Sequence, residues 1–239
     1  MVMIMMLGKG KGEGKKEHTP GRSWVKRILD ADKLDKLNKE LADAVIRADP
    51  KKVEEALKNG ANPNTKESGR PLLGWATIMS NLELDRDKIA KYVRIVEILL
   101  NAGANEYIGS LKRDDSFIKA LQQQVTSLGY TKELLDDYLF TYPQEPPLIH
   151  WAIFMLSSNV VKILIERRKV NLDESWQGYT PLMLAAVNGD MEIVKMLVKA
   201  GANITLDNGY WTAEDLARQN GHIEVAEYLK NKAAEQRRG

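Results

Sequence analysis

Few side chains of this protein are suited to catalysis or metal binding, and those few are scattered along the chain. The three histidines, His18, His150 and His222, lie far apart, and there is no cysteine to act as a thiol nucleophile or zinc ligand. A metal site needs several ligands that converge on one point, and no Ser/His/Asp arrangement has an interpretable local context. We therefore expect no catalytic residue, no metal site and no cofactor.

A glycine-lysine run and two pairs of neighbouring acids are the other chemical candidates. The run GKGKGEGKK (residues 8–16) mimics a phosphate-binding loop, but it lacks the Gly-Lys-Ser/Thr end and a preceding strand. We interpret it as part of a flexible basic N-terminal tail over residues 1–22. The acid pairs Asp114–Asp115 and Asp136–Asp137 are typical of charged helix faces in solvent.

The charge of the chain is small overall but uneven. The net charge of the 239 residues is +2, yet residues 1–30 hold seven Lys/Arg against three Asp/Glu. This tail could contact nucleic acid or an acidic surface, although no aromatic residues alternate with the basic ones, as single-strand binding would favour. No apolar run approaches the roughly 20 residues needed to cross a bilayer, so we expect no membrane partner.

The elements that would position any site recur along the chain. VKMLVKAGAN (194–203) has near copies in VEILLNAGAN (96–105) and VEEALKNGAN (53–62), each an apolar helix that ends in Gly-Ala-Asn. Glycine is favoured there because the residue after a helix often takes a positive φ. Upstream, RPLLGWATI, PPLIHWAIF and YTPLMLAAV place a proline in the first helical turn, followed by an alanine where helices approach closely. We therefore predict helix-turn-helix units in tandem.

The alanines set the period of the repeat. Ala152 and Ala185 are 33 residues apart, Ala185 and Ala217 are 32 apart, and Ala44 and Ala76 are 32 apart. The interval from Ala76 to Ala152 is 76, which predicts an 11-residue insertion near residues 81–92, in the turn between two helices, and a degenerate hidden unit around Ala120.

The stretch TPLMLAAVNGDMEIVKMLVKAGAN (180–203) resembles an ankyrin repeat, with its Thr-Pro-Leu start, paired alanines, turn glycine and Gly-Ala end. Gly74 and Met183 replace the family's histidine, and His150 keeps it. The resemblance implies an all-α ankyrin-repeat solenoid over residues 23–239, with about six repeats of which one is degenerate. The expected units are 39–69, 70–109, 112–143, 145–175, 176–207 and 208–235.

A helix over residues 23–38 is expected to cap the first repeat, because the end of a stack cannot leave its apolar face bare. An amphipathic helix that binds a partner is the alternative interpretation of this segment. In the family, the repeat histidine hydrogen-bonds backbone in the turn, which implies a structural role for His150. His222 follows a turn glycine, a common choice in the family, and we expect it to be structural too.

The resemblance also implies where a partner binds, because partners of this family usually meet the turn tips and the groove-facing residues of each first helix. Exposed aromatic and Met side chains are enriched at interfaces. The predicted partner-binding residues are Phe154, Met155, Trp176, Tyr179, Val187, Asn188, Asn208 and Trp211. The alternative is that irregular parts of the chain, 81–92 and 106–145, fold over these side chains and bury them.

The function implied by the resemblance is protein–protein binding by a non-enzymatic scaffold or adaptor, with a partner that the sequence does not identify. Two alternatives stay open: an effector or enzyme with activity in the irregular 81–145 region, and a nucleic-acid-associated protein that uses the basic tail. Nucleic acid is the less favoured partner, and self-association stays open. A cytoplasmic location is expected, with an exported effector as the alternative.

Overall fold

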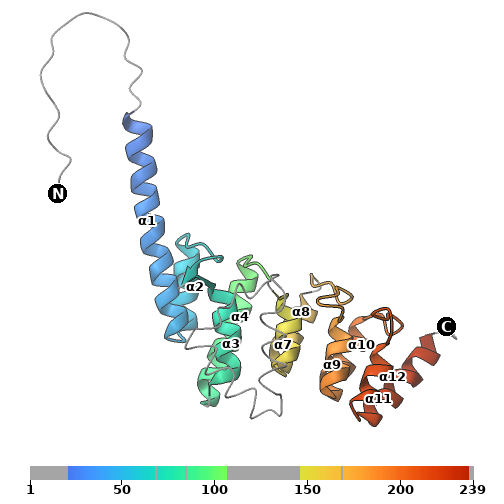
Figure 1. Ribbon diagram of the computed structural model, residues 1–239. Helices are drawn as coiled ribbons and strands as arrows, with labels where there is room; N and C mark the ends of the chain where they lie inside the picture. The colour runs from blue at the N-terminus through green and yellow to red at the C-terminus, as the bar shows by residue number, and fades with distance from the viewer. Residues whose placement is uncertain (1–20, 68, 84, 107–145, 168, 237–239) are drawn as a thin grey trace, which may run out of the picture.

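The computed structural model describes residues 21–67, 69–83, 85–106, 146–167 and 169–236, which form mostly helices (Figure 1). Two short strands, β1 (Lys66–Glu67) and β2 (Arg70–Pro71), pair antiparallel in a hairpin. No helix in these ranges is long and apolar enough to span a membrane. The described helices are α1 (Gly21–Ile46), α2 (Pro50–Lys58), α3 (Leu72–Leu82), α4 (Arg86–Asn101), α7 (Leu148–Phe154), α8 (Ser158–Glu166), α9 (Pro181–Asn188), α10 (Met191–Ala200), α11 (Ala213–Gln219) and α12 (Ile223–Gln236).

The helices form pairs, and the pairs follow one another in an elongated row (Figure 1). First helices touch along the row: α1 contacts α3, α7 contacts α9, and α9 contacts α11. The second helices form a parallel row in which α2 contacts α4, α4 contacts α8, and α8 contacts α10. A continuous core cluster has buried members in all five described pairs. Each pair thus covers the apolar face of its neighbour, which is how a repeat stack acquires a core. The predicted all-α repeat architecture is confirmed.

The local signals act as the sequence predicted. The described alanines that set the period of the repeat are all buried in the shared core: Ala44, Ala76, Ala152, Ala185 and Ala217. Ala120 lies outside the described residues. Thr180 starts α9 by accepting a hydrogen bond from the backbone N–H of Met183 at 3.2 Å. Gly201 ends α10 with a φ of 98°, which a residue with a Cβ adopts only at a cost.

The asparagine of the Gly-Ala-Asn ends links one unit to the next. The backbone N–H of Asn105 donates to the side chain of Asn64 at 2.7 Å. The backbone N–H of Asn203 donates in the same way to the carboxylate of Asp173 at 2.8 Å. These bonds satisfy backbone donors just beyond each helix end, where no intrahelical partner remains. The repeated motif therefore serves the joint between units as well as the helix stop.

The predicted placement of the insertion in a turn is wrong. Residues 83–85 are all that separate α3 from α4, and both helices are longer than their counterparts: α3 has 11 residues against 8 in α9, and α4 has 16 against 10 in α10. The added length stays helical because Asp85 caps α4, and because Tyr92 is buried and donates through its hydroxyl to Ile46 O at 3.1 Å. Burial in this position raises the pKa of Tyr92.

The units of α3/α4 and α7/α8 are in direct contact. Arg167, just after α8, donates to the carbonyl of Leu100 at 2.6 Å and to the side chain of Asn101, both at the end of α4. The backbone N–H of Leu148 donates to Glu106 O at 2.8 Å. These bonds join α4 directly to α8. The predicted unit 112–143 lies outside the described residues and stays a prediction.

At the N-terminal end, α1 is one continuous helix and passes through the expected boundary between a capping helix (23–38) and the first repeat. Its side chains at 30–36 are exposed, including Leu34 at 42%, and contact with the core begins near Leu37. Figure 1 shows the N-terminal part of α1 projecting beyond the helix pairs. The partner-binding interpretation of this helix therefore stays a prediction beside the capping one.

Candidate interaction surface

Three of the predicted partner-binding side chains are buried, so their placement on an exposed surface is wrong. Phe154 is 2% exposed, Met155 is 3% exposed and Trp176 is 6% exposed. The ring of Phe154 lies 5.9 Å from that of Trp151, and the ring of Trp176 lies 6.2 Å from His150. Other parts of the chain therefore cover these three side chains. Most of the irregular 106–145 segment, which the alternative interpretation invoked, lies outside the described residues.

Val187 and Asn188 are half-buried and take part in joints between first helices. The Asn188 side-chain amide donates to Ile153 O at 3.0 Å, and Val187 O accepts from His222 Nε2 at 3.0 Å. Tyr179 is half-buried as well, and its backbone bridges that of Trp176 across a tight turn. These three residues lie at the predicted positions, but much of their polar capacity is used inside the protein.

The loop between α10 and α11 is where Asn208 and Trp211 lie, and its own side chains build it. Asp207 accepts from the backbone N–H of Gly209 at 2.8 Å, and Asn208 Oδ1 accepts from those of Tyr210 and Trp211 at 3.2 and 3.0 Å. Such side-chain bonds to nearby backbone are what make Asp and Asn turn residues. Gly209 has a φ of 92°, which completes the reversal. The loop is therefore held in one conformation before any partner arrives.

Two aromatic side chains project from this loop. Tyr210 is 83% exposed and Trp211 is 41% exposed, with ring centroids 5.6 Å apart and a tilt of 43°. Tyr210 was missed in the sequence, where Trp211 stood out alone. The signal was present: Tyr210 follows Gly209 at the tip of a turn too short to fold over its own side chains. We call Tyr210 and Trp211 the aromatic pair.

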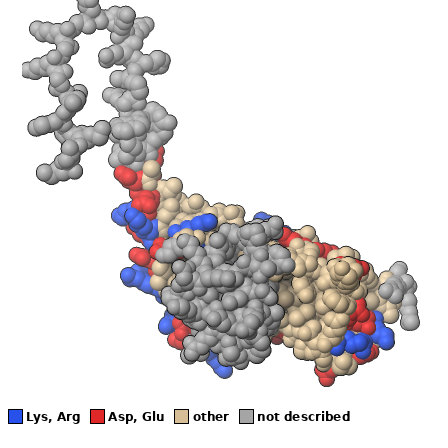
Figure 2. Space-filling view, in the orientation of Figure 1, with Lys and Arg blue, Asp and Glu red and all other residues tan. Residues whose placement is uncertain are grey.

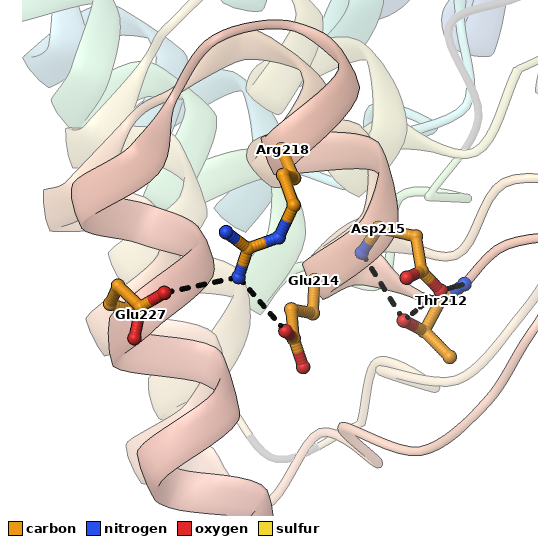
Figure 3. A network of polar contacts seen from close by, with 5 residues as sticks. All are labelled: Thr212, Glu214, Asp215, Arg218 and Glu227. Carbon is orange, nitrogen blue, oxygen red and sulfur yellow. Dashed lines mark hydrogen bonds and ion pairs between the residues drawn. The ribbon is translucent and has the colours of Figure 1, made fainter.

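A polar network fixes the chain directly after the aromatic pair (Figure 3). The Thr212 hydroxyl donates to Asp215 Oδ2 at 2.7 Å, and the backbone N–H of Thr212 donates to the same oxygen at 2.9 Å. These bonds lower the pKa of Asp215, the side-chain bond to Thr212 most of all. Arg218 joins the two helices of the last pair, since its Nη2 lies 3.2 Å from Glu214 on α11 and 3.1 Å from Glu227 on α12.

The face of the molecule that Figure 2 shows is poor in charge over its C-terminal half. In the view of Figure 2, uncharged residues cover most of the C-terminal half of the molecule, and acidic and basic side chains gather at its edges. Uncharged surface costs less to desolvate than charged surface, which is why charges are depleted at the centre of interfaces. The first helices at the other end of the row are open too: Ile46 and Arg47 are both exposed.

His150 and His222 have the structural roles that were expected of them, and His18 lies outside the described residues. Nε2 of His150 lies 3.0 Å from Tyr179 O, so it donates to this carbonyl, and the ring is buried. Burial lowers the pKa of His150 to about 4, which the backbone hydrogen bonds only partly offset. His222 makes the bond to Val187 O described above. Within the described ranges, no three His, Asp or Glu side chains gather as metal ligands would. The basic tail and most of the 81–145 region lie outside those ranges, so both alternative functions stay untested.

Comparisons with known proteins agree with these helix pairs. Residues 149–238 match a family model described as ankyrin repeats in three copies. The chain is 36% identical over 93 residues to ankyrin repeat and SAM domain-containing protein 6 of Mus musculus, covering 37% of this chain and 10% of that protein. It is 33% identical over 81 residues to a putative ankyrin repeat protein of Rickettsia felis, covering 34% and 21%. It is 41% identical over 58 residues to the Notch-regulated ankyrin repeat-containing protein of Xenopus tropicalis, covering 24% and 51%. The chain thus spans between a tenth and about half of the length of these relatives.

Proposed function

We propose that this chain, which carries ankyrin repeats, is a non-enzymatic adaptor that binds a partner protein through the row of first helices and the loop tips beside it. Ankyrin repeats are generally protein-interaction modules, which supports the class of function. We further infer that the five described helix pairs are layers of one solenoid. The contacts along both helix rows support this inference.

The observation that carries the choice of surface is the aromatic pair. Aromatic side chains bring a large apolar area with few rotatable bonds, and they dominate the binding energy of many interfaces. In this loop the backbone is already held by Asp207 and Asn208, so little conformational freedom is left to lose on binding. We place the centre of the binding surface at Tyr210 and Trp211, with Asn208 as a support of the loop. Tyr179 lies in the preceding loop, and Val187 and Asn188 lie farther along the row, at the C-terminal end of α9.

The test is a double substitution of the aromatic pair, Tyr210→Ala with Trp211→Ala. Loss of two such anchors is expected to cost about 2 kcal/mol or more of binding free energy, roughly a thirty-fold loss of affinity. Affinity capture from native lysate with mass spectrometry identifies the proteins that the wild-type chain retains, and titration of the recovered partner then measures the loss. Circular dichroism should show an unchanged helical signal, since both side chains are exposed.

The matched control is the double variant Leu34→Ala with Ile223→Ala, which removes exposed apolar surface elsewhere. The side chains of Leu34 and Ile223 are 42% and 51% exposed. This variant should bind as the wild type does. Equal affinity of the wild type and the aromatic-pair variant would refute the proposed surface. Loss of binding in the control variant alone would move the surface to α1 or α12.

A further inference from the structure

The second helices carry an apolar hollow that the proposed function does not use. It lies between the ends of α8 and α10, has a volume of about 720 Å³, and is lined by Ile165, Val170, Leu172 and Met196. All four side chains are half-buried, so part of their apolar surface faces water. Lys162, Glu166 and Lys199 stand at its rim.

A second hollow continues the first along the same row. It has a volume of about 520 Å³, lies between α10 and α12, and is lined by Lys195, Val198, Tyr228 and Lys232. Lys199 lines both hollows, so the two share a wall. The Lys195 ammonium lies 5.9 Å from the centroid of the Tyr228 ring, a distance at which a cation is attracted to the aromatic face.

The charge around the two hollows is positive, because four lysines face two glutamates. Glu235 pairs with Lys232 at 2.7 Å, and Glu166 lies 3.9 Å from Lys162. Lys195 and Lys199 have no ion pair among the described residues. Both are exposed and lie one helical turn apart on α10. Their ammonium groups therefore flank the apolar lining without a carboxylate to balance them.

We propose that the two hollows form one docking site for an acidic amphipathic segment of a partner protein. Apolar side chains of the segment enter the first hollow against Met196 and Ile165, and its carboxylates meet Lys195 and Lys199. Opposite charge at the rim favours the encounter and the orientation, and apolar burial supplies the affinity. This site lies on the second helices, so it does not depend on the aromatic pair.

If Lys195 and Lys199 served only to stabilise the fold, replacing them would change stability but not the binding of a partner. Lys199 is in the last turn of α10, where a cation favours the helix dipole whether or not anything binds. Lys58 is in the last turn of α2 in the same way, and neither Lys51 nor Lys58 lines the two hollows. The pair Lys51→Glu and Lys58→Glu therefore changes the net charge as much as Lys195→Glu and Lys199→Glu do, and also replaces a last-turn lysine, but away from the two hollows.

The experiment uses the full chain with ¹³C-labelled methionine methyl groups and a synthetic helical peptide that carries Leu at every third or fourth position and Glu elsewhere. We expect saturable shifts of the Met196 methyl signal, assigned with Met196→Leu. Lys195→Glu with Lys199→Glu should weaken binding at least ten-fold, and Lys51→Glu with Lys58→Glu should leave it within two-fold. If the first double variant fails to fold, Lys195→Gln with Lys199→Gln replaces it, with a smaller loss of affinity expected.

Two control peptides complete the test. A peptide with Ser in place of Leu and a peptide with Lys in place of Glu should both fail to bind, because each lacks one half of the recognition. Equal affinity in the two double variants would overturn the proposal, as would a Met196 signal that the peptide leaves unmoved. Binding of the Ser peptide as tight as that of the Leu peptide would reduce the site to general charge attraction and overturn it as well.

Discussion

Protonation of His150 should make the folded chain less stable below neutral pH. The ring is 0% exposed, its Nε2 donates to Tyr179 O at 3.0 Å, and burial lowers its pKa from 6.5 to about 4. Above pH 6.5 the ring is neutral in both the folded and the unfolded chain, and its contribution to stability is fully present. As pH falls below 6.5, His150 becomes protonated in the unfolded chain but stays neutral in the folded chain. The free energy of unfolding therefore falls until about pH 4, where the folded chain is protonated as well.

The size of the loss follows from the two pKa values. At pH 5 the unfolded histidine is almost fully protonated and the folded one is still mostly neutral, so the free energy of unfolding should fall by about 2 kcal/mol relative to pH 7. Below pH 4 the loss should level off near 3 kcal/mol. Carboxylates such as Asp215 also change stability with pH, so the wild type alone does not isolate the histidine.

His150→Gln isolates it, because the glutamine amide can still donate to Tyr179 O but does not titrate in this range. Urea unfolding followed by circular dichroism at 222 nm, at pH 7 and pH 5, gives the change for each protein. We expect the wild type to lose about 2 kcal/mol more than the variant between these two pH values. An equal change in both proteins would refute the argument that burial holds this ring neutral, as would an NMR titration of the ring with a midpoint near 6.5.

Three further predictions concern the joints of the stack, each measured by urea unfolding. Gly189→Ala should destabilise the fold by about 1 kcal/mol more than Gly201→Ala. Both glycines have positive φ, but a Cβ at Gly189 would lie 2.3 Å from the ring of His222, and one at Gly201 would meet nothing; equal losses would contradict this. Asp190→Ala removes the cap of α10 and should cost about 1 kcal/mol, while Asp190→Asn should retain most of the stability. Arg167→Met should cost about 1.5–3 kcal/mol, because it leaves Leu100 O and the side-chain oxygen of Asn101 without their charged donor. Unchanged cooperativity and midpoint in this variant would show that the joint between α4 and α8 does not rest on Arg167.

Much of the fold was predictable because its signals are local. The buried alanines, Thr180 at a helix start, Gly201 at a helix end and the hydrogen bond of His150 all follow from what one residue does to its own turn or to the next unit. The insertion was misplaced because its length alone does not tell whether added residues extend a loop or a helix. Contact of Tyr92 with the end of α1 decides for the helix, and this contact joins residues 46 positions apart.

The candidate site was predictable only in part. Trp211 and Asn208 lie in a short turn, where exposure follows from the loop itself. Phe154 and Met155 share the repeat register of Gln219 and Asn220, which are exposed, and Trp176 shares that of Asn208, yet all three are buried. Their repeat register matches that of exposed residues, so periodicity could not separate the two groups. Tyr210, the most exposed aromatic residue of the described chain, has no special place in the repeat pattern.

By itself, the sequence determined the class of fold, the period of its units and the caps of its helices. Proline, glycine, threonine and alanine act there through backbone angles and close approach, which depend on a few neighbouring residues. Only the tertiary structure decided that α4 packs directly on α8, that Phe154 and Met155 are covered, and that the aromatic pair is open to a partner. Exposure is a property of what packs against a side chain, and in a stacked chain those contacts come from residues tens of positions away.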